Sequence, residues 1–407
     1  MIFEFNRYSG LLLVFFIHGL VYSILLWRKG ILNDRASDKW LAAFLFLCIL
    51  YVSPWMLGFA GWYEGFTCLP CRNFMFYMPL QHTLLMGPCI FFYVRTLFQT
   101  TYKFKKLDKL HFVPSCLYIV WCLVVFVIDQ VILKKYYLMN GRSDPDFDDW
   151  YILAGLISFL FYLVLSFRDY SQYKLFIEQQ FSFADSIKFR WVRNFLVACF
   201  IYFFLNLSFH IVQIFGVEVN YTTNWWYYLL FGILLYYMAI NGYTHSIETR
   251  QHFGMELLFF KSPALLMAPK PGPIATTEDI NFETIENAEA TERSKTEMNG
   301  WKDKVLKAVV DEKLYANPEL TLTHLAKHLD TNTTQLSKII NAGFSMNFND
   351  FINYYRVLEV QQKLKAEGAG QFTIMSLAYD AGFNSKATFN RAFKKVTAKN
   401  PRDFISS

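Results

Sequence analysis

The sequence predicts an all-α protein in which a bundle of seven membrane-crossing helices precedes a smaller, polar helical domain. Of the 407 residues, 54% are hydrophobic and 19% are aromatic, well above the usage of soluble proteins. Apolar runs of helical length occur only before about Tyr243. After residue 300, apolar residues instead recur every three or four positions, which is typical of amphipathic helices in a soluble domain.

Each of the seven apolar runs is long enough to cross a hydrocarbon core of about 30 Å as a helix. Trp, Tyr or charged residues flank every run, which suits the interface between lipid and water. The first run follows Glu4 and Arg7 and has no small-residue cleavage site after it, so we expect it to persist as an anchor. The runs are Ser9–Trp27, Trp40–Trp62, Phe74–Phe98, Leu110–Leu133, Trp150–Phe167, Phe195–Gly216 and Trp225–Tyr243.

The distribution of Lys and Arg predicts the orientation of the bundle. The loops after the first, third and fifth runs hold 13 of these residues, whereas the N-terminus and the other loops hold 5. Short loops rich in Lys and Arg stay in the cytoplasm. We therefore expect the N-terminus outside and the C-terminal domain inside.

A change of composition separates the two parts. Residues 261–300 contain four prolines followed by seven acidic residues and few large apolar ones. Such a segment cannot bury enough surface to fold. The expected organisation is a membrane domain over 1–260, a disordered linker over 261–300 and a folded domain over 301–407.

The folded domain carries 15 Lys and Arg against 10 Asp and Glu, a balance compatible with a polyanionic partner. After an amphipathic helix around Trp301–Tyr315, the pattern predicts a helix, a short turn and a second helix. Thr321 is placed to cap the first helix, and Asp330–Asn332 to form the turn and cap the second. The outer face of the second helix then carries Thr334, Ser337 and Lys338. The residues expected to pack the pair are Leu325, Ala326, Leu329, Leu336, Ile339 and Ile340.

A second helix pair follows a long helix expected over about Asn347–Ala366. Gly382 lies at its turn, where a positive φ or close packing favours glycine. Ser385 is placed to cap the last helix of the pair. Its outward residues are Lys386, Ala387, Thr388 and Arg391.

The run A-G-F-N-S-K-A-T-F-N-R-A-F-K-K, followed by N-P-R-D-F, resembles the second-unit signature of the AraC/XylS family of bacterial transcription regulators. The resemblance covers the last hundred residues and implies two helix-turn-helix units that enter successive major grooves of double-stranded DNA. It departs from the family at Thr397-Ala398-Lys399, where a glycine is usual, so the final turn is expected to differ. The base-reading residues it implies are Thr334, Ser337, Lys338, Lys386, Ala387, Thr388 and Arg391.

The membrane half also resembles a known group. The motifs G-P-C-I-F-F-Y-V-R at Gly87–Arg95 and H-F-V-P at His111–Pro114 are similar to those in seven-span sensor regions of multi-pass AraC-type regulators common in Bacteroidetes. They imply no particular ligand.

Among the polar residues inside the apolar runs, five are candidates for an intramembrane site: Gln81, His82, Asn206, His210 and Gln213. The last three share one helical face. Polar groups are costly in lipid, and they either form a ligand or proton site or hydrogen-bond neighbouring helices. No metal site is expected, because no close-spaced ligand set accompanies the histidines.

Cys68 and Cys71 lie in a loop expected outside the cell, where oxidation is permitted. They form either a disulfide that staples the loop locally or senses redox changes, or a pair of idle thiols. The other five cysteines fall within apolar runs and are expected to pack as small apolar residues.

The sequence thus favours a transcription regulator anchored in a bacterial inner membrane, with its DNA-binding domain in the cytoplasm. A small-molecule or envelope signal and a homodimer are the expected partners besides DNA and lipid. The alternative is a receptor or transporter whose basic tail tethers it to DNA or protein. Common motifs for proteolysis, ester hydrolysis and phosphate binding do not occur, so we expect no enzymatic activity and no cofactor.

Overall fold

The computed structural model describes residues 3–63, 68–99, 102–139, 145–184, 190–214, 221–248, 297–367 and 373–405. Within these ranges the secondary structure is helical, apart from an isolated antiparallel bridge between Phe181 and Thr321. The prediction of an all-α protein is confirmed. Most of the expected linker, residues 261–296, lies outside the described residues, while 297–300 belong to a helix.

The chain divides into two compact units. The first contains Met1–Tyr170 and Phe189–Glu256, and the second contains Ser171–Lys188 together with Leu257–Ser407. The C-terminal unit therefore includes a segment that the sequence places in the membrane domain. That segment is the end of one long helix and the residues that follow it.

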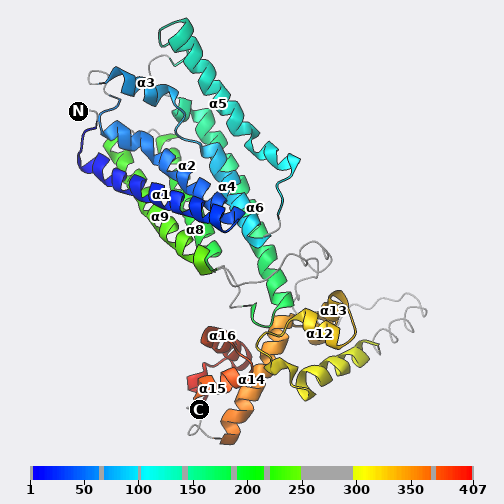
Figure 1. Ribbon diagram of the computed structural model, residues 1–407. Helices are drawn as coiled ribbons and strands as arrows, with labels where there is room; N and C mark the ends of the chain where they lie inside the picture. Colours follow the sequence, from blue (N-terminus) through cyan, green and yellow to red (C-terminus); the bar gives the residue numbers. More distant parts are fainter. Residues whose placement is uncertain are drawn as a thin grey trace. The chain divides into compact units, whose positions relative to one another are not determined.

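The first unit is built from long apolar helices (Figure 1). Among them, α1 packs against α2 and α9, and α2 also packs against α4. The helices are α1 (Arg7–Leu32), α2 (Ala36–Phe59), α3 (Leu69–Tyr77), α4 (Thr83–Phe98), η1 (Lys106–Phe112), α5 (Val113–Phe126), η2 (Val127–Ile132), η3 (Pro145–Phe147), α6 (Asp149–Gln180), α8 (Arg190–Ile214) and α9 (Tyr221–Glu248).

Five helical stretches of the described residues are long and apolar enough to cross a membrane, and they match five of the seven expected runs. Two runs differ. α9 is 28 residues long, but its many Tyr and Trp residues lower its mean hydropathy. α4 has only 16 residues. The five stretches are Arg7–Leu32, Ala36–Phe59, Lys106–Ile132, Asp149–Gln180 and Arg190–Val212.

The expected continuous run Phe74–Phe98 is wrong, because residues 78–82 between α3 and α4 are not helical. Pro79 is one cause. The residue before a proline avoids the helical region, and Met78 has φ −86° and ψ 114°. The chain therefore leaves the helix at this point and resumes it five residues later.

The break has hydrogen bonds of its own. The carboxylate of Asp146 accepts the backbone N–H groups of Leu80 at 2.7 Å and Gln81 at 2.9 Å. It also accepts the hydroxyl of Tyr118. These bonds replace the helical ones that the two amides lack, so the break is a stable feature.

The second unit contains the predicted helix pairs (Figure 1). Helical residues 297–306 lead into η6, and the end of α6 belongs to the same unit. The remaining helices are η6 (Lys307–Asp311), η7 (Leu314–Ala316), α12 (Leu322–His328), α13 (Thr333–Phe344), α14 (Phe348–Glu367), α15 (Ile374–Asp380), α16 (Lys386–Thr397) and α17 (Pro401–Ile405).

The long helix α14 separates two hydrophobic cores. Its N-terminal half contributes Phe348, Phe351 and Ile352 to a core shared with α12 and α13. Its C-terminal half contributes Val357 and Val360 to a core shared with α15 and α16. α14 thus acts as the common support of both helix pairs, within one residue of its predicted bounds.

The first helix pair begins at the predicted caps. The Thr321 side chain accepts the N–H of His324 at 3.1 Å, and the Asn332 side chain accepts the N–H of Gln335 at 2.8 Å. These bonds satisfy amides that have no partner inside their helices. The predicted interior of this pair is confirmed, with Leu329 only partly buried.

The final turn is closed by a residue other than glycine. Ala398 ends α16 in the left-handed conformation with φ 60°. The Thr397 hydroxyl accepts the N–H of Lys399 at 3.1 Å and closes the turn locally. A non-glycine residue is thereby held in a conformation that glycine adopts more readily.

Gly382 is required for two reasons, and we predict that Gly382→Ala destabilises the second unit by about 2–4 kcal/mol. Its φ is +93°, and an added Cβ would lie 2.7 Å from the carbonyl oxygens of Tyr315 and Ala316. Pulse proteolysis of the detergent-solubilised protein in increasing urea measures this loss through the C-terminal fragment. Gly300→Ala is the control, because its Cβ would meet nothing within 4 Å. Equal resistance of the two variants would contradict the prediction.

Candidate functional site

The second helix of each pair is positioned in the same way. Asn332 caps α13, and Ser385 caps α16 with a hydroxyl that accepts the N–H of Thr388 at 3.2 Å. Each helix buries one apolar face against α14 and its own partner helix. The opposite faces are free to carry polar side chains, and the resemblance places base reading there.

On α13, the predicted outer face is only partly correct. Lys338 is exposed and Thr334 is half-buried. Ser337 is only 6% exposed, and its hydroxyl accepts a hydrogen bond from the Asn341 amide at 3.4 Å. Ser337 lies between Leu336 and the packed positions that follow, so the helix turns it toward the core edge rather than outward.

On α16, Lys386, Ala387 and Arg391 are exposed, as expected. Thr388 is not, since it is 2% exposed and its hydroxyl hydrogen-bonds the Ser385 hydroxyl at 2.8 Å. The third residue after a helix cap lies directly above the capping side chain. The prediction that Thr388 faces outward is therefore wrong, because this residue completes the cap.

Arg391 has a distinct electrostatic environment. The residue as a whole is exposed, but partial burial of its guanidinium lowers the pKa of that group, and the carboxylate of Glu178 opposes this shift. Glu178 belongs to the end of α6, within the second unit. A negative charge therefore lies near a side chain that the resemblance assigns to base reading.

Arg356 on α14 is a structural residue that the sequence did not reveal. It is 1% exposed, and burial lowers its pKa to about 9, so it remains a cation at neutral pH. It donates to the backbone oxygens of Tyr315 and Asn317, both at 2.7 Å. Its spacing in the sequence could have predicted this burial. Arg356 lies four residues after Ile352 and four before Val360, both of which are buried on the same face of the helix.

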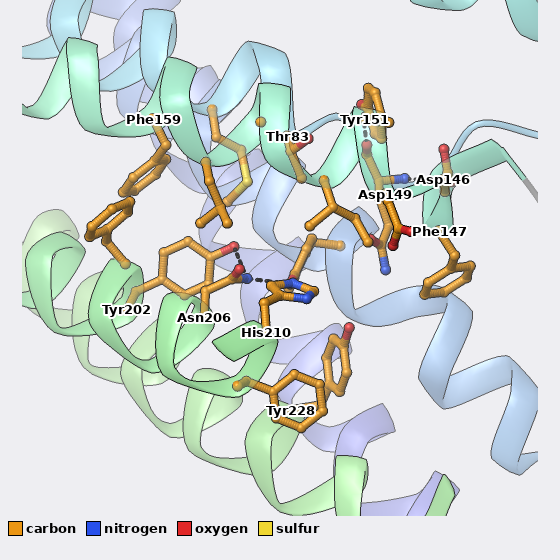
Figure 2. A pocket seen from close by; sticks show the side chains of 18 of the residues that line it. Thr83, Asp146, Phe147, Asp149, Tyr151, Phe159, Tyr202, Asn206, His210 and Tyr228 are labelled. Carbon is orange, nitrogen blue, oxygen red and sulfur yellow. Dashed lines mark hydrogen bonds between the residues drawn. The ribbon is translucent and has the colours of Figure 1, made fainter. Parts of the chain in front are cut away.

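The first unit contains a cavity of about 290 Å³ (Figure 2). It brings together three of the five predicted intramembrane polar residues, namely Gln81, Asn206 and His210. His82 does not line it and instead precedes the first turn of α4. The side chain of Gln213 lies outside the described part of the structure. The other residues that line the cavity include Tyr51, Trp55, Thr83, Asp146, Phe147, Asp149, Tyr151, Leu156, Phe159, Tyr202, Asn224 and Tyr228.

The cavity wall combines aromatic rings with polar groups. The Asn206 amide donates to the hydroxyls of Tyr51 at 2.9 Å and Tyr227 at 2.7 Å. Three buried polar atoms on this wall, Gln81 Nε2, Thr83 Oγ1 and Asn224 Oδ1, make no close hydrogen bond within the described residues. Since buried polar groups are normally paired, these atoms are candidates to hydrogen-bond a bound molecule.

Cys68 and Cys71 are joined by a disulfide next to α3. The other five cysteines are not joined in disulfides, and among them only Cys116 is exposed. In the part of the chain that the structure describes, no three His, Cys, Asp or Glu side chains gather as metal ligands.

Comparison with known proteins bears on the second unit. The sequence profile of a family described as a helix-turn-helix domain matches residues 325–407. No match was found among the curated proteins or among the solved structures. The match begins within α12 and extends past α17, so it covers both candidate reading helices. Residues 325–407 are therefore a helix-turn-helix domain, which supports a DNA-binding transcription regulator.

Proposed function

We propose that the protein is a membrane-anchored, sequence-specific transcription regulator of the AraC type. The observation that carries this proposal is the pair of capped helices α13 and α16, which present Lys338, Lys386 and Arg391 to solvent within the matched helix-turn-helix region. A DNA-binding domain indicates a regulator rather than an enzyme.

The geometry of α14 supports reading by both units. Its 20 residues span about 30 Å as a helix, close to the roughly 34 Å that separate successive major-groove faces of DNA. Arg391 is suited to form two hydrogen bonds with a guanine base, and Lys338 and Lys386 are suited to bind either a guanine base or a backbone phosphate. Ser337 and Thr388 would then act by shaping their helices, while Thr334 and Ala387 contact bases or the thymine methyl group.

The membrane domain is proposed to detect the signal. With the N-terminus outside, the ends of α2 and α8 and the starts of α4, α6 and α9 would all lie on the outer side of the membrane. These segments, with the short helix η3, line the cavity. The cavity would therefore open away from the Lys-rich and Arg-rich loops, toward an external or envelope compound.

The lining also suggests the class of compound. Asp146 already accepts three hydrogen bonds, and aromatic rings form much of the wall. No Lys or Arg is among the residues that line the cavity. A compact, uncharged molecule with a flat apolar face and hydrogen-bonding groups fits this wall better than an anion. A homodimer would place two DNA-binding domains on paired half-sites.

Selection of bound sequences from a random DNA pool tests DNA reading. We expect the full-length protein in nanodiscs at near-physiological salt to recover a two-part motif. Arg391→Ala and Lys338→Ala should each weaken binding by roughly tenfold or more, and Arg391→Ala should relax one motif position. Lys327→Ala on α12, also exposed, is the matched control. Retention that depends on salt but not on sequence would favour the tether alternative.

Filling the cavity tests signal detection. Leu156 lines the cavity from α6, whereas Leu153 on the same helix is 59% exposed. We expect Leu156→Trp to fix a reporter gene under the selected motif at one level across growth conditions that shift it in the wild type. Leu153→Trp should leave the response intact, with equal membrane insertion and DNA binding in both variants. An unchanged response in Leu156→Trp would contradict a sensing role for the cavity.

A further inference from the structure

The end of α6 is built into the DNA-binding unit. Ser182 is fully buried, and its N–H donates to the Leu320 oxygen at 3.2 Å. Phe181 pairs with Thr321 in the antiparallel bridge. Thr321 is the cap of α12, so this segment adjoins the start of the first helix-turn-helix unit.

α14 holds the same segment from its other side. The Asn349 amide donates to the backbone oxygens of Phe181 at 3.1 Å and Ser182 at 2.9 Å. The Asn353 amide donates to the Ser182 oxygen at 3.2 Å. Arg356 donates to the Ser182 hydroxyl at 3.1 Å. Three polar side chains of one helix, each at most 4% exposed, therefore converge on two residues.

The buried polar face of α14 depends on Phe181 and Ser182 for its hydrogen-bond acceptors. Buried amides and a buried guanidinium are costly when their hydrogen bonds are lost. Phe181, Phe183 and Ala184 are at most 5% exposed, so the segment also closes the surface against water. Residues 301–407 alone would leave Asn349, Asn353 and part of Arg356 without these acceptors.

Glu178, one helical turn before this segment, interacts electrostatically with α16, the second of the two helices proposed to read DNA. Its carboxylate stabilises the charged form of Arg391 on α16. When DNA binds, a guanine base or a backbone phosphate would compete with the Glu178 carboxylate for the Arg391 guanidinium. Docking of the segment thus brings a carboxylate into electrostatic interaction with one cation of the proposed DNA-binding surface.

We propose that residues 178–184, here called the strap, are an autoinhibitory element that docks on α14 and lowers DNA affinity until it is released. The regulatory part of this inference rests on the function proposed above. α6 runs unbroken from Asp149, at the cavity, to Gln180 in the strap. A compound that favours one arrangement of α6 would thereby change the docking equilibrium.

Affinity for the selected DNA site tests inhibition in the full-length protein. Glu178→Gln should bind roughly fivefold more tightly, because it removes the competing carboxylate while keeping the shape of the side chain. Glu319→Gln, an exposed acidic residue of the same unit, is the control for the loss of one charge. Equal affinities of the two variants would overturn inhibition by the strap.

Hydrogen exchange of the same protein tests docking without reference to DNA. We expect the Ser182 amide to be as protected as the interior of α14. Asn349→Ala should speed its exchange roughly tenfold, whereas Gln362→Ala, on the exposed face of α14, should not. Fast exchange of the strap in the wild type would overturn docking. So would protection that disappears on dilution, because the strap would then come from a second copy.

The two readouts separate the proposals. Protection of the strap without sequence-specific DNA binding would contradict the proposed function and support docking of the strap. Sequence-specific binding together with fast exchange of the strap would contradict docking and support the proposed function.

Discussion

The buried guanidinium of Arg356 is the interaction on which the second unit depends. A planar group with five N–H donors can serve several acceptors at once, and here it binds the turn at Tyr315 and Asn317, the strap at Ser182 and its own helix at Asn353. The same turn leaves no room for a Cβ at Gly382, which would lie 2.7 Å from the carbonyl oxygens of Tyr315 and Ala316, and Phe383 lies beside the guanidinium. One side chain therefore fixes both helix pairs and the strap relative to α14.

In the first unit, the acidic residue Asp146 has a role similar to that of Arg356. Its carboxylate accepts hydrogen bonds from two backbone amides and a tyrosine hydroxyl, and so stabilises the break before α4. In both units a buried charge is surrounded by groups of opposite polarity, which is the condition under which such a charge is tolerated. The two irregular segments that result, 78–82 and the strap, are also the ones that shape the proposed cavity and the proposed regulation.

The sequence predicted those features that depend on neighbouring residues. Helix periodicity, the caps at Thr321, Asn332 and Ser385, and the positive φ of Gly382 all have local causes, and the structure confirms them. Contacts between distant residues were missed. Asp146 lies 65 residues from Gln81, and Ser182 lies 174 residues from Arg356, so no local pattern joins them. The outward placement of Ser337 and Thr388 failed because helical spacing does not distinguish an outer face from its buried margin.

The position of the strap in the chain has a consequence for biosynthesis. Ser182 leaves the ribosome long before Arg356, with which it later hydrogen-bonds. α6 would by then already be committed to the membrane, because apolar helices insert as they are made. The strap could then dock on the DNA-binding unit only while it is held at the end of the inserted α6. A chain that fails to insert would not hold the strap in this way, and a fragment that starts after α6 would have no strap to dock. Correct insertion would therefore itself be a condition for the proposed regulation.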